Sequence, residues 1–209
     1  RGGILRVTFD GGIVDGKGLL SDEDPLNKYY AYGIRNNFGI GFDALTGNLW
    51  QTENGRSTDD EINLVLPGFN SGWREVIGYS NMERGFNEEN LEDFGGKGTY
   101  SEPEFIWRDA IAPTSVLFVD TDNLGSKYKD NLFVGSVKNG TIFNFLLDDT
   151  RTKLVLAGPL SDRIADTNQE TGSVVFGRNF GVITDLQVGP DGNVYVLSNY
   201  KHDGTIFKI

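Results

Sequence analysis

The chain has 209 residues, of which 38% are hydrophobic and 23% charged, a composition typical of a folded globular chain and not of a disordered one. It contains no cysteine and a single histidine, His202, which excludes disulfide scaffolds, thiolate metal sites and centres built from several histidines. The net charge is −11, so the chain lacks the excess of basic residues found in proteins that bind nucleic acids or anionic membranes. An acidic chain is, however, suited to binding calcium.

Short alternating apolar runs, bounded by Gly, Asn or Asp, predict strands throughout the chain. In chain order they lie at residues 4–7, 39–43, 47–52, 60–65, 115–119, 131–135, 139–145, 184–188, 193–197 and 203–209. Turn signals such as Asn139-Gly140 and Asp203-Gly204, with 28 glycines in all, complete an all-β pattern. The acidic run 87–94 is interpreted as a loop with at most one helical turn, and Trp73 and Trp107 as core aromatics.

Internal repetition points to one architecture. The run 131–136 is echoed at 193–198 and more weakly at 48–53, and each copy has an apolar strand before and after it. Such recurring units are typical of β-propeller blades. We expect the closing strand of one blade at 1–10 and three blades at about 30–80, 105–148 and 180–209, with a long acidic loop at about 80–104. Three blades cannot close a ring, so we expect either a segment of a longer protein or self-association of two copies to complete the propeller.

Several polar features are candidates for chemistry, and each also has a structural interpretation. Arg35 and Asn36 can present a fork of donors and an amide to a planar carboxylated ligand, or can bind loop carbonyls. The run Asp59-Asp60-Glu61 can supply oxygen ligands to calcium, but without EF-hand spacing it favours a solvated turn. Lys138 and His202 stand at predicted hairpin turns, where basic side chains are usually exposed.

Nine motifs, taken in order, resemble one known family over nearly the whole chain. They are Tyr32–Asn36, Gly41–Asp43, Thr46–Trp50, Thr52–Gly55, Asp60–Leu64, Gly68–Trp73, Ala112–Ser115, Asn131–Lys138 and Val188–Leu197. The order is similar to that of the glucose/sorbosone dehydrogenases, soluble sugar dehydrogenases that use pyrroloquinoline quinone (PQQ). This order of motifs is far more specific than any one of them.

The resemblance implies a six-bladed propeller of which this chain is the C-terminal half, with PQQ across the top of the ring and calcium beside it. The implied contacts are Arg35, Asn36, Asn54 and Lys138 for PQQ, the carbonyls of Gly55 and Arg56 for calcium, and Glu61, Tyr79 and Asn81 for a second, structural calcium. Lys138 would approach the quinone and stabilise negative charge developing on its oxygen.

The implied activity is oxidation of the C1 hydroxyl of aldose sugars by hydride transfer to PQQ, in a periplasmic or secreted setting. A general base must remove the hydroxyl proton, but the family's catalytic histidine has no match here, since His202 lies elsewhere. Many members also carry cofactor-binding arginines near residues 182–184, where this chain has none. We therefore expect no catalytic residue on this segment and no sugar oxidation by these 209 residues alone.

Two further functions stay open beside the enzyme. A non-catalytic β-propeller that binds a protein or glycan partner is suggested by the missing arginines and by the acidic insertion Glu83–Glu102. A calcium-dependent lactone hydrolase would need converging side-chain carboxylates, whereas Gly55 and Arg56 offer carbonyls. The expected partners are an aldose substrate and a second copy of the chain, with no nucleic acid and no membrane span.

Overall fold

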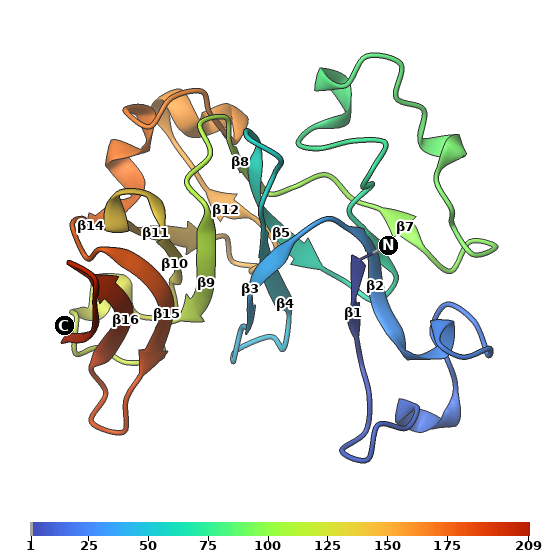
Figure 1. Ribbon diagram of the computed structural model, residues 1–209, viewed down its shortest axis with the longest axis horizontal. Coiled ribbons are helices and arrows are strands. Elements are labelled where there is room, and N and C mark those ends of the chain that lie inside the picture. The colour runs from blue at the N-terminus through green and yellow to red at the C-terminus, as the bar shows by residue number, and fades with distance from the viewer. Residues whose placement is uncertain (1) are drawn as a thin grey trace. The chain divides into compact units, whose positions relative to one another are not determined.

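The chain is all-β, as the sequence predicts, in a computed structural model that describes residues 2–209 (Figure 1). Within those residues there are 17 strands and short 3₁₀ turns, but no α-helix. The chain divides into two compact units. One unit is formed by the chain up to Asn36 together with Val65–Pro103, and the other by Asn37–Leu64 together with Glu104–Ile209.

The first unit contains one sheet with the strand order β1-β2-β6-β7. Its strands are β1 (Gly2–Leu5), β2 (Tyr29–Ile34), β6 (Phe69–Asn70) and β7 (Thr99–Tyr100). β1 is antiparallel to β2, whereas β6 pairs with β2 and β7 in parallel. Gly33 is needed in β2 because its φ is +66° and a Cβ there would lie 1.9 Å from the Asn70 amide oxygen. This close approach places the buried Tyr32 and Asn70 opposite each other.

The second unit begins with a five-stranded sheet in the order β13-β8-β5-β4-β3. Its strands are β3 (Asn37–Phe42), β4 (Leu49–Glu53), β5 (Asp60–Val65), β8 (Phe105–Trp107) and β13 (Ile164–Ala165). Every residue of β4, β5 and β8 is buried, which means that both faces of the sheet are covered at these strands. Polar residues within them must therefore find partners inside the protein.

Two more sheets complete the second unit, with orders β12-β11-β10-β9 (β14 also pairs with β11) and β15-β16-β17. Their strands are β9 (Pro113–Phe118), β10 (Leu132–Ser136), β11 (Ile142–Leu147), β12 (Leu154–Val155), β14 (Val175–Gly177), β15 (Val182–Val188), β16 (Val194–Tyr200) and β17 (Asp203–Lys208). Burial alternates along β15 and β16, so only one face of the last sheet is fully covered.

Short 3₁₀ turns lie in the connections between strands. They are η1 (Val14–Gly16), η2 (Leu26–Lys28), η3 (Ser80–Met82), η4 (Glu88–Asn90), η5 (Ser126–Tyr128), η6 (Lys138–Gly140), η7 (Gly158–Asp162) and η8 (Glu170–Val174). None of the helical segments among residues 2–209 has the length and apolar character needed to cross a membrane.

The core of the second unit is strongly aromatic. The ring of the fully buried Trp107 lies 4.9 Å from that of Phe105, 5.2 Å from Phe143 and 5.9 Å from Phe145, measured between centroids. These contacts join β8 to β11, since aromatic rings pack well edge to face. A second cluster that includes Phe133 joins β10 to β15 and β16.

Each run predicted as a strand overlaps an observed strand, and η4 is the one turn expected within 87–94. The alternating pattern did not reveal β6, β7, β12 or β13, because strands of two residues carry no periodicity. It also missed the longer strands β2, β8 and β14. Trp107 is a core residue as predicted, whereas Trp73 is only half-buried.

A buried ion pair joins two loops of the second unit. Arg151 donates from Nε to Asp43 Oδ2 at 2.5 Å and from Nη2 to the Asp130 carbonyl at 2.7 Å. The Asp43 side chain is 1% exposed and that of Arg151 15%. Burial raises the pKa of Asp43, but hydrogen bonds from Arg151, the Thr46 hydroxyl and the Leu45 N–H outweigh it and hold the pKa below its usual value.

The substitution Asp43→Asn should lower the free energy of unfolding at neutral pH by about 3 kcal/mol, because Arg151 then keeps a buried charge without its partner. A carboxylate with a lowered pKa stabilises the fold above its unfolded pKa and loses that contribution as the pH falls through its folded pKa. The deficit of the variant should therefore shrink in acid, which urea unfolding at neutral and acidic pH would measure. Asp149→Asn, at an exposed carboxylate near Arg151, is the control, and an equal loss in both variants would contradict this account.

Candidate functional site

Asp60, at the start of β5, binds two loops through its carboxylate. Oδ1 accepts a hydrogen bond from the Gly55 N–H at 2.9 Å, and Oδ2 accepts from the N–H groups of Ile111 and Ala112 at 2.8 Å each. The residue is 1% exposed, so these donors take the place of water. Burial holds the pKa of Asp60 above its usual value, although the three hydrogen bonds and the positive charge of Lys138 offset part of that effect.

The segment that Asp60 holds also fixes the turn that carries Lys138. The Val137 N–H donates to the Ala112 carbonyl at 2.9 Å, and the Lys138 N–H donates to the Ile111 carbonyl at 3.1 Å. Residues 111–112 are thus bonded to Asp60 by their N–H groups and to η6 by their carbonyls. The Lys138 side chain is exposed at the start of this turn, as the sequence predicts.

Asn54 and Gly55, two of the other predicted contacts, belong to the same assembly. The Asn54 side-chain amide donates to the Pro113 carbonyl at 3.1 Å, directly after the segment held by Asp60. The structure therefore brings Asn54, Gly55 and Lys138 into one hydrogen-bonded network around Asp60. This corrects the interpretation of residues 59–61 as a solvated turn, because Asp60 and Glu61 are both buried.

A cavity of about 690 Å³ lies beside η6 in the second unit. Asn139, Asn179 and Asn199 line it with side-chain amides, and Lys201 and His202 add basic groups, with no aspartate or glutamate in its wall. The chain as a whole has a net charge of −11, but the wall of this cavity carries basic groups and no carboxylate. The cavity is therefore suited to an anionic molecule rich in oxygen.

Two glycines allow the backbone to form the wall of this cavity. A Cβ at Gly140 would lie 2.3 Å from the Gly181 nitrogen, and one at Gly181 would lie 2.7 Å from the Asn199 carbonyl oxygen. Both residues also have positive φ, +49° and +82°. The backbone segments around Gly140, Gly181 and Asn199, which are distant in the sequence, can therefore pack closely together beside the turn that carries Lys138.

The first unit carries the other predicted cofactor contacts. Arg35 is half-buried, with its guanidinium carbon 5.6 Å from the centroid of the Trp73 ring, a cation–π contact. Asn36 is exposed at the end of this unit. Tyr79 is buried next to η3, and Asn81 within η3 is exposed.

The predicted metal ligands form no carboxylate cage. Among residues 2–209 there is no group of three His, Asp or Glu side chains that could hold a metal ion. Glu61 is 4% exposed and accepts a hydrogen bond from the Asn63 amide at 3.0 Å. A calcium ion at Gly55 and Arg56 would therefore depend on backbone carbonyls, which are good ligands for this cation.

The sequence pattern of the glucose/sorbosone dehydrogenases matches residues 1–208. The chain belongs to this family. The aldose sugar dehydrogenase YliI of Escherichia coli is 27% identical over 212 residues, which cover 100% of this chain and 51% of that protein. Quinoprotein glucose dehydrogenase B of Acinetobacter calcoaceticus is 27% identical over 259 residues, or 98% and 50% of the two chains. The chain thus spans about half the length of the relatives it matches.

Solved structures of aldose sugar dehydrogenases share the fold of this chain. The apo form of the soluble aldose sugar dehydrogenase of E. coli matches with a TM-score of 0.70 and 23% identity, covering 100% of this chain and 54% of that one. The PQQ-bound aldose sugar dehydrogenase of Streptomyces coelicolor matches with a TM-score of 0.66 and 19% identity, covering 99% and 51%.

The donor set beside η6 fits PQQ, a flat molecule with several carboxylates. Carboxylates and quinone oxygens accept hydrogen bonds from amide N–H groups, from the Lys201 ammonium and from an imidazole N–H such as that of His202, all of which the wall offers. Sequence reasoning missed Asp60 as the organiser of this site and the convergence of the three asparagines. The local signal was weak, because Asn139 stands beside Gly140 whereas Asn179 and Asn199 have no neighbouring glycine.

The substitution Asp60→Ala should lower the free energy of unfolding by about 2 kcal/mol, because it leaves three backbone N–H groups without their acceptor. Amide exchange should accelerate at Gly55, Ile111 and Ala112, which hydrogen-exchange mass spectrometry would resolve by segment. Asp120→Asn, at an exposed carboxylate, is the control. Unchanged protection of residues 111–112 in Asp60→Ala would contradict the proposed network.

Proposed function

We propose that this chain forms part of a PQQ-dependent oxidoreductase that oxidises the C1 hydroxyl of aldose sugars by hydride transfer to PQQ. The observation that carries this proposal is the basic, amide-lined cavity beside the Lys138 turn, in an acidic chain of the glucose/sorbosone dehydrogenase family. The relatives named as a quinoprotein glucose dehydrogenase and an aldose sugar dehydrogenase support it. PQQ, when bound, supplies a quinone that accepts the hydride.

Lys138 has the central part in this proposal. Its ammonium group would stabilise negative charge on a quinone oxygen of bound PQQ, and the hydrogen bond from the Lys138 N–H to the Ile111 carbonyl holds its turn in place. Arg35, Asn36 and Asn54 are proposed as further contacts to PQQ. The Asn54 amide also donates to the Pro113 carbonyl, which fixes this side chain next to the segment that Asp60 holds.

Calcium is part of the same proposal. The carbonyls of Gly55 and Arg56 would hold one ion beside PQQ, and Glu61, Tyr79 and Asn81 would contribute to a second. Asp60 supports the first site indirectly, since its bond to the Gly55 N–H restrains the loop that offers the carbonyls. The proton of the sugar hydroxyl is assigned to a base outside this segment.

The setting of this activity is also proposed. The repeated sheets of the second unit support three consecutive blades of a six-bladed propeller, completed by further chain or by a second copy. We place the protein in the periplasm or outside the cell, by analogy with its family.

A non-catalytic binding module is the second candidate function. It is favoured by one observation, that Val182 and Thr184 stand in a region where many family members carry cofactor-binding arginines. Val182 lines the cavity beside η6 and offers it no hydrogen-bond donor from its side chain. Binding of PQQ therefore separates the two candidates.

In the full-length protein, PQQ with calcium should raise the melting temperature, and Lys138→Ala should weaken PQQ binding by roughly 10- to 100-fold, the worth of one charge-assisted hydrogen bond. Dye reduction with aldoses should fall with it, because the developing charge loses its partner. Thermal shift and a PQQ titration measure the first effect, and a dye assay the second.

Lys138→Arg should retain part of the binding, since it keeps the charge. Lys129→Ala, at an exposed lysine whose ion pair to Asp122 spans 3.8 Å, is the matched control. The absence of any PQQ-induced stabilisation in the unmodified protein would reject the enzyme and favour the binding module.

A further inference from the structure

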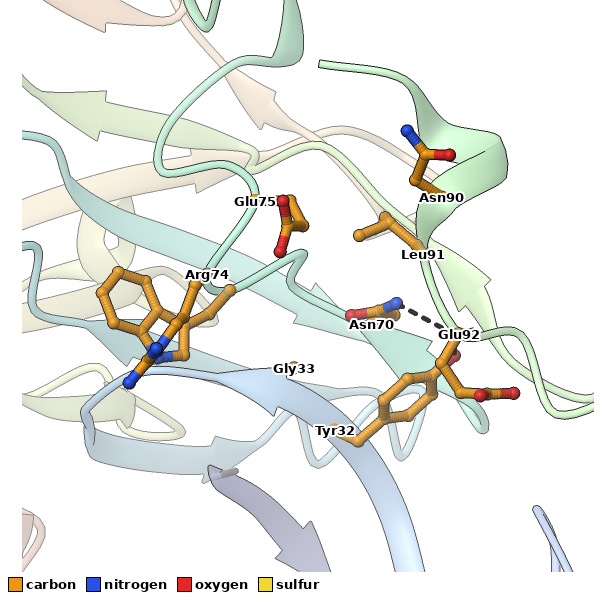
Figure 2. Close-up of a pocket in the computed structure, with 9 residues that line it drawn as sticks. Tyr32, Gly33, Asn70, Arg74, Glu75, Asn90, Leu91 and Glu92 are labelled. Carbon is orange, nitrogen blue, oxygen red and sulfur yellow. Dashed lines mark hydrogen bonds between the residues drawn. The ribbon is translucent and has the colours of Figure 1, made fainter. Parts of the chain in front are cut away.

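A second cavity, of about 510 Å³, lies wholly within the first unit (Figure 2). Figure 2 shows Tyr32 and Asn70 along one side and Glu75 and Leu91 along the other. The two sides come from different parts of the chain, because β2 and β6 supply the first and the segment after Gly72 and the acidic insertion supply the second. Its volume is within the roughly 300–1,000 Å³ of small-molecule sites.

The insertion is tied to the sheet at the edge of this cavity. The Tyr32 hydroxyl donates to the Glu92 carbonyl, and the Asn70 amide donates to the same carbonyl at 3.4 Å. The Asn70 side-chain oxygen accepts from the Gly72 N–H at 2.9 Å, so both ends of this buried amide are engaged. The hydrogen bonds hold the wall formed by Leu91 and Glu92 over the sheet and keep the cavity open in a defined shape.

The lining combines aromatic rings with polar groups of both signs. Trp73 and Tyr32 contribute aromatic rings to the lining, while the Arg74 guanidinium can donate hydrogen bonds and the Glu75 and Glu92 carboxylates can accept them. Arg74 and Glu75 are exposed, so they can turn to a ligand without breaking a buried contact. No single charge dominates, in contrast to the cavity of the second unit.

We propose that this cavity binds a neutral pyranose unit of a saccharide. A pyranose ring has an apolar C–H surface that packs on aromatic carbon, and its hydroxyls both donate and accept hydrogen bonds. A wall with an indole ring, a guanidinium and two carboxylates meets both requirements. An anionic ligand would instead meet the carboxylates of Glu75 and Glu92. The proposal does not depend on PQQ or on sugar oxidation, because none of the residues that line this cavity is a proposed PQQ or calcium contact.

Trp73 provides a direct readout of binding. Of the three tryptophans in this chain, Trp50 and Trp107 are fully buried, whereas Trp73 lines this cavity. In the full-length protein labelled with fluorotryptophan, Trp73→Phe would assign the Trp73 signal in fluorine NMR spectra. Titration with maltose, cellobiose or xylobiose should shift that signal saturably and leave the Trp50 and Trp107 signals in place.

Glu75→Ala should weaken the saccharide by about tenfold or more, the worth of one hydrogen bond to a charged group. Glu83→Ala, at an exposed carboxylate of the acidic insertion that does not line the cavity, is the matched control and should bind as the unmodified protein does. Unchanged Trp50 and Trp107 signals would show that Glu75→Ala is folded.

Lys138→Ala separates this site from the oxidation proposed above, because it should lose PQQ affinity and keep the saccharide-induced shift of Trp73. The proposal is overturned if no neutral saccharide shifts the Trp73 signal, if Glu75→Ala binds as tightly as the control, or if only charged probes such as glucosamine or galacturonate shift it. If the unmodified full-length protein fails to bind PQQ while its Trp73 signal still responds to a saccharide, the oxidoreductase is rejected and this site stands.

Discussion

One buried carboxylate, that of Asp60, determines the geometry of the loops that carry the predicted cofactor contacts in the second unit. A buried carboxylate needs hydrogen-bond donors in place of water, and three backbone N–H groups supply them to this side chain, which is 1% exposed. Since those N–H groups point at Asp60, the carbonyls of Ile111 and Ala112 are free to accept from η6. The position of Lys138 therefore depends on a side chain that would touch no ligand.

This arrangement also holds strained backbone in place. Asp59, Ala112 and Asn139 have φ values of +61°, +53° and +62°, each costing on the order of 1 kcal/mol or more for a residue with a side chain. Asp59 precedes Asp60, Ala112 donates to it, and Asn139 lies in the turn bonded to residues 111–112. Because such conformations persist only where surrounding bonds over-determine them, their concentration around one carboxylate points to a loop geometry that function requires.

The fold followed from local patterns, whereas the site did not. Alternating residues and glycine turns predicted β10 and β16 because both features are local in the sequence. The burial of Asp60 was hidden, since its donors Ile111 and Ala112 stand some 50 positions away and an acidic run resembles a solvated turn. The pairing of β2 with β1, and of β8 with β5, likewise depends on contacts between distant segments that no local period encodes.

The cavity beside η6 and the cavity of the first unit differ in the charges that line them, because the former has no carboxylate and the latter has two. A net charge of −11 repels an anion on approach, and this repulsion fades beyond about 10 Å at ordinary ionic strength. An anionic cofactor must then be held by short-range contacts, which is what a wall of amides and basic groups without carboxylates offers. A neutral saccharide has no net charge to be repelled, so its cavity can use Glu75 and Glu92 as acceptors. The negative charge of the chain thus limits which residues can line a site for an anion, whereas a site for a neutral saccharide can include carboxylates.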